Sequence, residues 1–336
     1  MPFYHRICAL ILLLAPMANA AASSDARIDE ASCKRVDTGP GPHSLLALPG
    51  NERVLISSHE RRQFEAAGEI IDYQPLSQRQ RVLPRRNEPA GLVLRPHHLQ
   101  FRVTPDATLI YLINHDDDTP NGRRHSILVY ALESDSLRFR QRLTSPLLSS
   151  PNHLAISPDG DIYVSNDRRD GDSVMELVLR SKKATLVHYR EGNGWRVAAE
   201  GLSFPNGVMA ESGRVLVSQT FGGNLIEWPR LADGRLGNAI VRWKMPLLDG
   251  LFTLPGSDDV LTIAHGSLVD FLRHKSKGEH LSPATVYRVD AQGVAVPFFV
   301  ENGQRISGLS AVVFSGGHVL FGQSFEPFLL QCRWVG

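Results

Sequence analysis

A pattern of two short strands around a tight turn occupies residues 150–166, Ser150-Pro-Asn-His-Leu-Ala-Ile-Ser-Pro-Asp-Gly-Asp-Ile-Tyr-Val-Ser-Asn166. Residues 152–157 place the apolar run Leu154-Ala-Ile156 between polar residues, which is consistent with a short strand. A turn that ends in glycine follows, and Ile162-Tyr-Val164 then restarts in β-branched and aromatic residues. This pattern predicts a β-hairpin.

The same hairpin pattern occurs six times along the chain. Each copy opens on a polar residue, continues as an apolar strand, turns at a cluster of turn-forming residues and restarts as a second strand. The opening residues are His43, His97, Asn152, Asn206, Asp249 and Ser307, and their numbers differ by 54, 55, 54, 43 and 58 from one copy to the next. A period of roughly 40–50 residues with several strands per unit is the signature of a β-propeller. The sequence therefore predicts an all-β fold, a six-bladed β-propeller with four-stranded blades.

The six opening residues should meet around the axis of this fold. In a propeller the innermost strand of each blade lines a central channel, so equivalent positions converge on one ring. A single polar residue at a strand start is readily explained by turn capping. Six of them in register, including one carboxylate and two carboxamides, favour a binding site. Such oxygen donors suit a hard cation such as Ca²⁺.

Composition describes an ordinary globular protein. The chain has 336 residues, of which 42% are hydrophobic and 21% are charged, and the repeat predicts one closed domain over residues 21–336. The formal net charge is +1. Because no basic face is evident, nucleic acid is not expected as a partner.

The first twenty residues have the features of a secretory signal peptide. His5-Arg6 forms the basic region, residues 7–16 are apolar, and Ala18-Asn-Ala20 is a small-residue cleavage site. An uncleaved membrane anchor is the alternative, but the apolar run is short and no later segment approaches a stable membrane span. We therefore expect a secreted or periplasmic protein.

Two cysteines remain after removal of such a leader, which would carry Cys8 away. Cys33 and Cys332 lie near the two ends of the mature chain. In an oxidising compartment they are a candidate disulfide that would join the first and last blades. Two separate free thiols are the alternative. Between the fifth and sixth copies, residues 268–280 could form a short helix that covers the mouth of the channel.

Several motifs occur in a fixed order between the two terminal cysteines. They are Pro96-His97, Leu112-Ile-Asn-His115, Ser150-Pro-Asn152, Tyr163-Val-Ser-Asn-Asp167, Ala199-Glu-Gly-Leu-Ser-Phe-Pro-Asn206-Gly, Leu248-Asp249 and Ala264-His265. In these motifs the chain resembles the serum paraoxonase/arylesterase family of calcium-dependent lactonases, which is related to the gluconolactonase and regucalcin-like proteins. The resemblance covers nearly the whole mature chain and implies a small-molecule lactone or ester substrate.

The resemblance also implies roles for individual residues. Asn152, Asn206 and Asp249 match ligands of the family's catalytic calcium. His97 and His115 match the histidine pair that activates water, and His265 matches a histidine of the substrate pocket. This assignment is chemically reasonable, because a bound cation polarises a carbonyl and a neutral imidazole accepts a proton from water.

The chain departs from the family at positions that bind calcium. The carboxylate of the first blade is replaced by His43, its companion acid by Ser44, the acid after Asn152 by His153, and the carboxamide after Asp249 by Gly250. The family's second, structural calcium is therefore not expected. With His43 as a further ligand, one divalent cation is expected, either Ca²⁺ or, because imidazole is a nitrogen donor, Zn²⁺ or another transition metal. No organic cofactor is expected.

Three functions remain open from the sequence. The first is a metal-dependent hydrolase of lactones or aryl esters. The second is a metal-free propeller that serves as a binding or scaffold module, and the third is a strictosidine-synthase-like propeller that uses the channel without metal. A serine nucleophile is not expected, because the sequence contains no Gly-x-Ser-x-Gly elbow.

Overall fold

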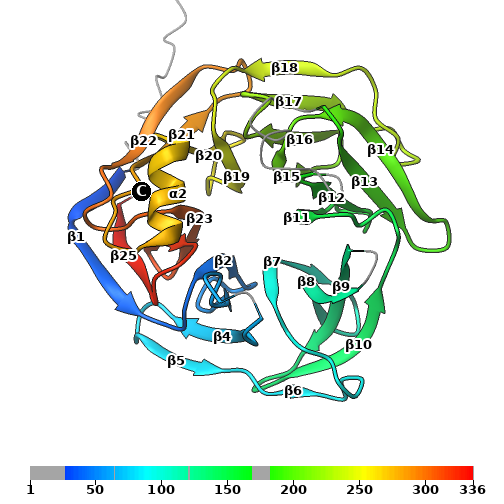
Figure 1. Ribbon diagram of the computed structural model, residues 1–336, viewed down its shortest axis with the longest axis horizontal. Helices are drawn as coiled ribbons and strands as arrows, with labels where there is room; N and C mark the ends of the chain where they lie inside the picture. The colour runs from blue at the N-terminus through cyan, green and yellow to red at the C-terminus, as the bar shows by residue number, and fades with distance from the viewer. Residues whose placement is uncertain (1–26, 64, 120–121, 169–181, 336) are drawn as a thin grey trace, which may run out of the picture.

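The computed structural model describes residues 27–63, 65–119, 122–168 and 182–335. The predicted signal peptide lies outside this part of the chain. Six antiparallel sheets are arranged in a ring around a central axis, which confirms the predicted six-bladed β-propeller (Figure 1). From the inner to the outer strand the blades are β2 Pro42–Ala47, β3 Val54–Ser58, β4 Glu69–Gln74 and β5 Arg79–Val82; β7 Pro96–Val103, β8 Thr108–Thr119, β9 Gly122–Leu132, β10 Leu137–Leu143 and β6 Arg85–Arg86; β11 Pro151–Ile156, β12 Ile162–Asn166, β13 Ala184–Arg190 and β14 Gly194–Leu202; β15 Pro205–Ala210, β16 Arg214–Gln219, β17 Asn224–Pro229 and β18 Ile240–Trp243; β19 Leu248–Thr253, β20 Val260–His265, β21 Ala284–Val289 and β22 Ala295–Glu301; and β23 Leu309–Ser315, β24 His318–Gln323, β25 Phe328–Val335 and β1 Arg27–Asp37.

The hairpin predicted over residues 150–166 is formed by β11 and β12. Leu154 pairs with Val164 and Ile156 with Ile162, so the apolar residues of the two strands are held in one register. The turn closes through a hydrogen bond from the Ser157 amide to the Asp161 carbonyl, and Gly160 adopts a φ of 94° that disfavours residues with a Cβ. Most blades have four strands, and the short β6 adds a fifth, parallel strand to the second blade.

The two ends of the described chain close the ring together. β1 pairs antiparallel with β25, so the last blade is built from both ends of the described chain (Figure 1). Cys33 on β1 and Cys332 on β25 form the predicted disulfide, at a sequence separation of 299. The closure is therefore both hydrogen-bonded and covalent.

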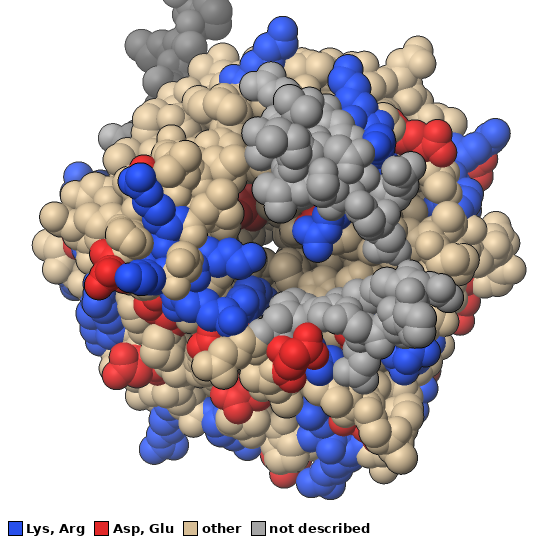
Figure 2. Space-filling model, viewed as in Figure 1, with Lys and Arg blue, Asp and Glu red and all other residues tan. Residues whose placement is uncertain are grey.

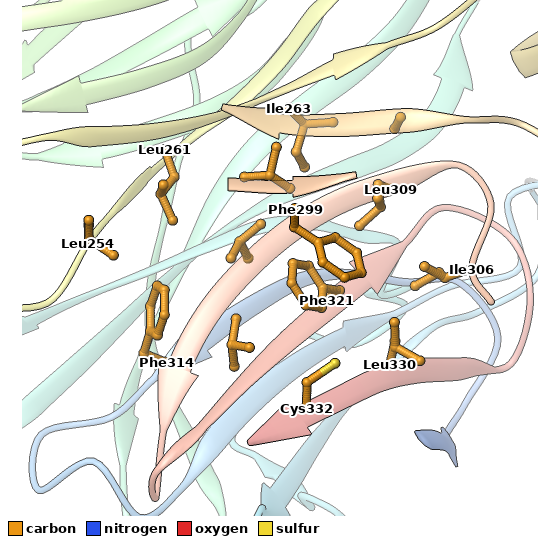
Figure 3. Packing of buried hydrophobic residues seen from close by; sticks show 14 residues of the cluster. Leu254, Leu261, Ile263, Phe299, Ile306, Leu309, Phe314, Phe321, Leu330 and Cys332 are labelled. Atoms are coloured by element: carbon orange, nitrogen blue, oxygen red, sulfur yellow. The ribbon is translucent and has the colours of Figure 1, made fainter. Parts of the chain in front are cut away.

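Hydrophobic packing occurs mainly between neighbouring blades. One cluster joins the fifth and sixth blades, where Phe299 of β22 stacks on Phe321 of β24 with ring centroids 4.2 Å apart (Figure 3). Cys332 belongs to the same cluster and is almost fully buried. Because each blade packs against the next, the inner strands are fixed relative to one another around the axis.

The predicted helix between the fifth and sixth inner strands is α2, Leu268–Ser276. Its first turn is capped by Ser267, whose side chain accepts a hydrogen bond from the Asp270 amide. The helix contacts the loop between β24 and β25 through Nε2 of His274, which lies 2.9 Å from the Glu326 carboxylate. No helix in the described part of the chain has the length and apolar character needed to cross a membrane.

Candidate functional site

A pocket of about 460 Å³ opens where the inner strands begin. Five of the six residues predicted to form the ring line it, one from each of five successive blades. They are His43, His97, Asn152, Asn206 and Asp249. Their convergence follows from their shared register, because each is the second residue of its inner strand.

The prediction for the sixth blade was wrong. Ser307 precedes β23, and its hydroxyl donates to the Gly303 carbonyl and accepts from the Ser282 amide, so it fastens a loop. The residue in ring register is Ser310, the second residue of β23. It is nevertheless not among the pocket-lining residues, and its hydroxyl donates to the carbonyl of His43. The polar pattern could not reveal this shift, because both serines precede apolar residues.

The predicted histidine pair is in contact. Nδ1 of His97 lies 3.1 Å from Nε2 of His115, and Nδ1 of His115 lies 2.9 Å from Nδ1 of His125. Burial, with the nearby His43, His115 and Arg61, lowers the pKa of His97 well below 6.5, so this imidazole is neutral near neutral pH. The three rings thus form a chain of nitrogen contacts that begins at a neutral imidazole in the pocket.

His125 was missed by sequence reasoning. It lies on β9, directly opposite His115 in the β8–β9 register, and it lines the pocket. The sequence does contain a signal for it, because His125 follows His115 by ten residues with a turn between them. That signal becomes meaningful only once the two strands are known to pair.

The fifth blade contributes a carboxylate–imidazole pair. Nε2 of His265, at the end of β20, lies 2.8 Å from the Asp249 carboxylate. His265 also lines the pocket. On the third blade, the Asn152 amide donates to the Asp167 carboxylate at 3.4 Å, and Ser150 donates to the same carboxylate at 2.6 Å. Burial raises the pKa of Asp167, despite these hydrogen bonds.

Serines on second strands fix the backbone of the ring residues. Ser57 donates to the carbonyl of His97, Ser165 to that of Asn206 and Ser218 to that of Asp249. Each bond runs from one blade to the ring residue of the next. The ring is therefore positioned by contacts between blades, which the sequence of a single blade does not reveal.

A divalent cation in this pocket would need the carboxamides among its ligands. Within the described residues no three His, Cys, Asp or Glu side chains are placed to hold a metal ion by themselves. The amide oxygens of Asn152 and Asn206, with Asp249 and the buried, unpartnered Nδ1 of His43, form a mixed oxygen and nitrogen donor set. A single carboxylate makes this set weaker for Ca²⁺ than a set with several.

The rest of the wall is largely apolar and in two places strained. Phe204 and Leu247 both adopt positive φ angles, 53° and 59°, and both line the pocket. Left-handed backbone is unfavourable for bulky residues, and it persists here because hydrogen bonds hold it: the Thr220 amide donates to the Phe204 carbonyl, and the Leu247 amide donates to the Thr220 carbonyl. These residues precede inner strands and turn apolar side chains to the pocket.

A comparison with curated sequences found one relative at significant similarity, and no family model matches the chain. The relative is mechanosensory abnormality protein 6 of Caenorhabditis elegans, 25% identical over 217 residues that cover 60% of this chain. The match spans 56% of that protein, or about half of its length.

Solved structures share the fold over nearly the whole chain. A gluconolactonase-like protein has 14% identity and a TM-score of 0.58, with 93% of each chain covered. A luciferin-regenerating enzyme has 8% identity and a TM-score of 0.60, covering 90% of this chain and 95% of its own. An aldose sugar dehydrogenase of Streptomyces coelicolor has 14% identity and a TM-score of 0.54, covering 92% and 98%. At these identities the likeness is one of fold, and the chain is similar in fold to gluconolactonase-like and related six-bladed propeller enzymes.

Proposed function

We propose that this protein hydrolyses lactones or aryl esters in the channel pocket. The observation that supports this most directly is the contact between the neutral imidazole of His97 and His115 in a pocket with a mainly apolar wall. The similarity in fold to a gluconolactonase-like protein supports the same class of reaction. Membership of the paraoxonase/arylesterase family is part of the proposal.

In the proposed mechanism His97 acts as the general base. Its Nε2 is buried and has no hydrogen-bond partner among the described residues, so its lone pair can accept a proton from water as the water oxygen bonds to the carbonyl carbon. The same Nε2–H then returns the proton to the leaving oxygen as the ester C–O bond breaks. In the tautomer that acts as the base, the proton of His97 is on Nδ1, which donates a hydrogen bond to Nε2 of His115. Nδ1 of His115 in turn donates to Nδ1 of His125. His115 thereby holds His97 in the tautomer that a base requires.

The metal remains part of the proposal. Asn152, Asn206, Asp249 and His43 would hold the cation, Ca²⁺ or Zn²⁺, which would polarise the substrate carbonyl when bound. His265 would orient the Asp249 carboxylate through the 2.8 Å contact. We further propose that the protein is secreted or periplasmic, and the disulfide fits an oxidising compartment.

A metal-free binding module is the second candidate. It is favoured by the ring itself, which has one carboxylate and places an imidazole, His43, where the family it resembles has an acid. The structure also brings a guanidinium, that of Arg61, to the same pocket.

Hydrolysis assays on the purified mature protein test the first candidate. Turnover of a γ-lactone or phenyl acetate that is lost on chelation and restored by Ca²⁺ or Zn²⁺ is the expected result.

His97→Gln should lower kcat by about 10²–10⁴-fold, because it removes the general base. His280→Gln, which alters an exposed histidine outside the pocket, is the matched control. Absence of turnover by the folded protein with either metal would favour the binding module.

A further inference from the structure

We infer that the pocket selects ligands with an anionic group on an apolar body, and that Arg61 and Lys275 bind the anionic group. For substrates this inference rests on the proposed hydrolase function, whereas for binding it stands on the charges of the pocket alone. The preferred substrate is therefore an aryl or acyl ester that carries a carboxylate, rather than a neutral ester.

Arg61 is a charged group without a carboxylate partner among the described residues. Its guanidinium donates only to backbone carbonyls, those of Gly41, His59 and Pro96, at 3.0–3.3 Å. Burial destabilises the charge and lowers the pKa of Arg61 to about 9. Arg61 is half-buried at the pocket wall, and a partly desolvated cation without a counter-ion is destabilised, so a bound anion would offset that cost. The neighbouring Arg62 differs, because it forms an ion pair with Glu326 at 2.8 Å.

Lys275 and Arg61 belong to two segments of the chain that hydrogen bonds hold together. Arg62 donates to the carbonyls of His274 and Lys275 at 2.8 and 3.0 Å, which fastens the end of α2 to the Arg61 loop. Lys275 is exposed, lines the pocket and has no ion pair within the described residues. The two cations therefore belong to adjoining parts of the pocket wall.

The remaining charged side chains of the pocket do not neutralise these two cations, because they comprise two carboxylates and a third cation, Arg168, which acts on Asp167. The acidic residues of the pocket are Asp249, which His265 contacts, and Asp167, which Ser150 and Asn152 contact. Figure 2 shows Lys and Arg side chains around the central hollow of this face. A field of this sign draws anions toward the channel.

The apolar part of the ligand is accommodated by aromatic side chains. Phe204 and Phe221 pack edge to face with centroids 5.1 Å apart, and Phe271 lies 5.7 Å from Phe325. Phe271 and Lys275 are four residues apart on α2 and so share one face of the helix. This face presents a ring and an ammonium group to the same pocket, which is the pattern that an amphiphilic anion requires.

A pair of non-hydrolysable probes tests the binding site without requiring turnover. By isothermal titration calorimetry, 3-methoxybenzoate should bind the mature protein about tenfold more tightly than the neutral 3-methoxybenzamide, since hydrogen bonds to charged groups are the stronger ones. The difference should shrink as salt is raised. Lys275→Gln should remove most of it, and Arg61→Gln should do the same if that variant folds. Lys277→Gln, an exposed lysine outside the pocket, should leave it unchanged.

A matched pair of substrates then separates this inference from the proposed function. The wild-type protein should hydrolyse 3-acetoxybenzoate with a kcat/KM about tenfold above that for its methyl ester. Equal binding of the two probes by the folded wild-type protein, or an anion preference that persists in Lys275→Gln, would overturn the inference even if esters are hydrolysed. Anion-selective binding without hydrolysis of either ester would uphold it and contradict the hydrolase proposal.

Discussion

His115 lies between two other imidazoles and contacts each through a different ring nitrogen. An amide side chain could fill part of its volume but could not accept and donate in the same directions. His115→Gln is therefore expected to lower kcat for ester hydrolysis by about 10²-fold or more while KM changes little, because the loss falls on proton transfer. Steady-state kinetics of this variant beside His280→Gln provide the measurement, and an unaltered kcat would exclude His115 from the reaction.

A second imidazole pair lies deeper, where His98 and His153 approach with ring centroids 3.4 Å apart. Burial lowers the pKa of His98 well below 6.5 and that of His153 to about 3. As pH falls below about 6.5, the unfolded chain gains protons at these residues before the folded chain does, so the free energy of unfolding decreases. Above that pH both states are neutral and the effect is absent.

His98→Gln is expected to reduce this pH dependence. Removing one such group should decrease the slope of unfolding free energy against pH by up to about 1.4 kcal/mol per pH unit below pH 6.5. The glutamine oxygen can still accept the hydrogen bond that the Leu154 amide now donates to His98. Urea unfolding at about pH 5 and pH 7 gives the slope. If it matches the wild-type slope, the imidazole does not titrate as its burial implies.

At the scale of elements, α2 joins the mouth of the pocket to the sixth blade. Ser267→Ala removes the side chain that caps the helix and should cost about 1 kcal/mol of stability. Because α2 carries Leu268, Phe271 and Lys275 into the pocket, a frayed first turn should also raise KM for aryl esters. Ser276→Ala, at the exposed end of the helix, is the control, and equal melting temperatures for the two variants would show that the cap contributes nothing.

At the scale of the whole molecule, closure depends on β1, β25 and one disulfide. Replacing Cys33 and Cys332 together with serine should lower the free energy of unfolding by about 2–5 kcal/mol, because the unfolded chain is no longer constrained as a loop. The β1–β25 hydrogen bonds remain in this variant, so the folded protein should keep its far-UV circular dichroism. Unfolding in urea with and without a reductant measures the effect. A wild-type protein whose stability is insensitive to reduction would contradict it.

The sequence alone predicted the six blades, the disulfide and five of the ring positions. It did so because a propeller blade is a local unit whose strand alternation and turns are encoded within about fifty residues. Repetition then places equivalent residues, such as Asn152 and Asn206, around one axis. The helix over residues 268–280 was predicted for similar reasons, and in the structure it ends at Ser276.

The rest of the pocket was decided by tertiary structure. Arg61 and Phe204 lie outside the strands, where no periodicity marks a side chain as facing inward, and His125 becomes significant only through its pairing with His115. Ser307 was wrongly placed in the ring because a polar residue before an apolar run does not show at which residue the strand begins. The strand β23 begins two residues later, at Leu309. The ring residues could be found because a local pattern of strands and turns repeats along the chain, whereas the charge and shape of the pocket depend on loops that meet only when the six blades close.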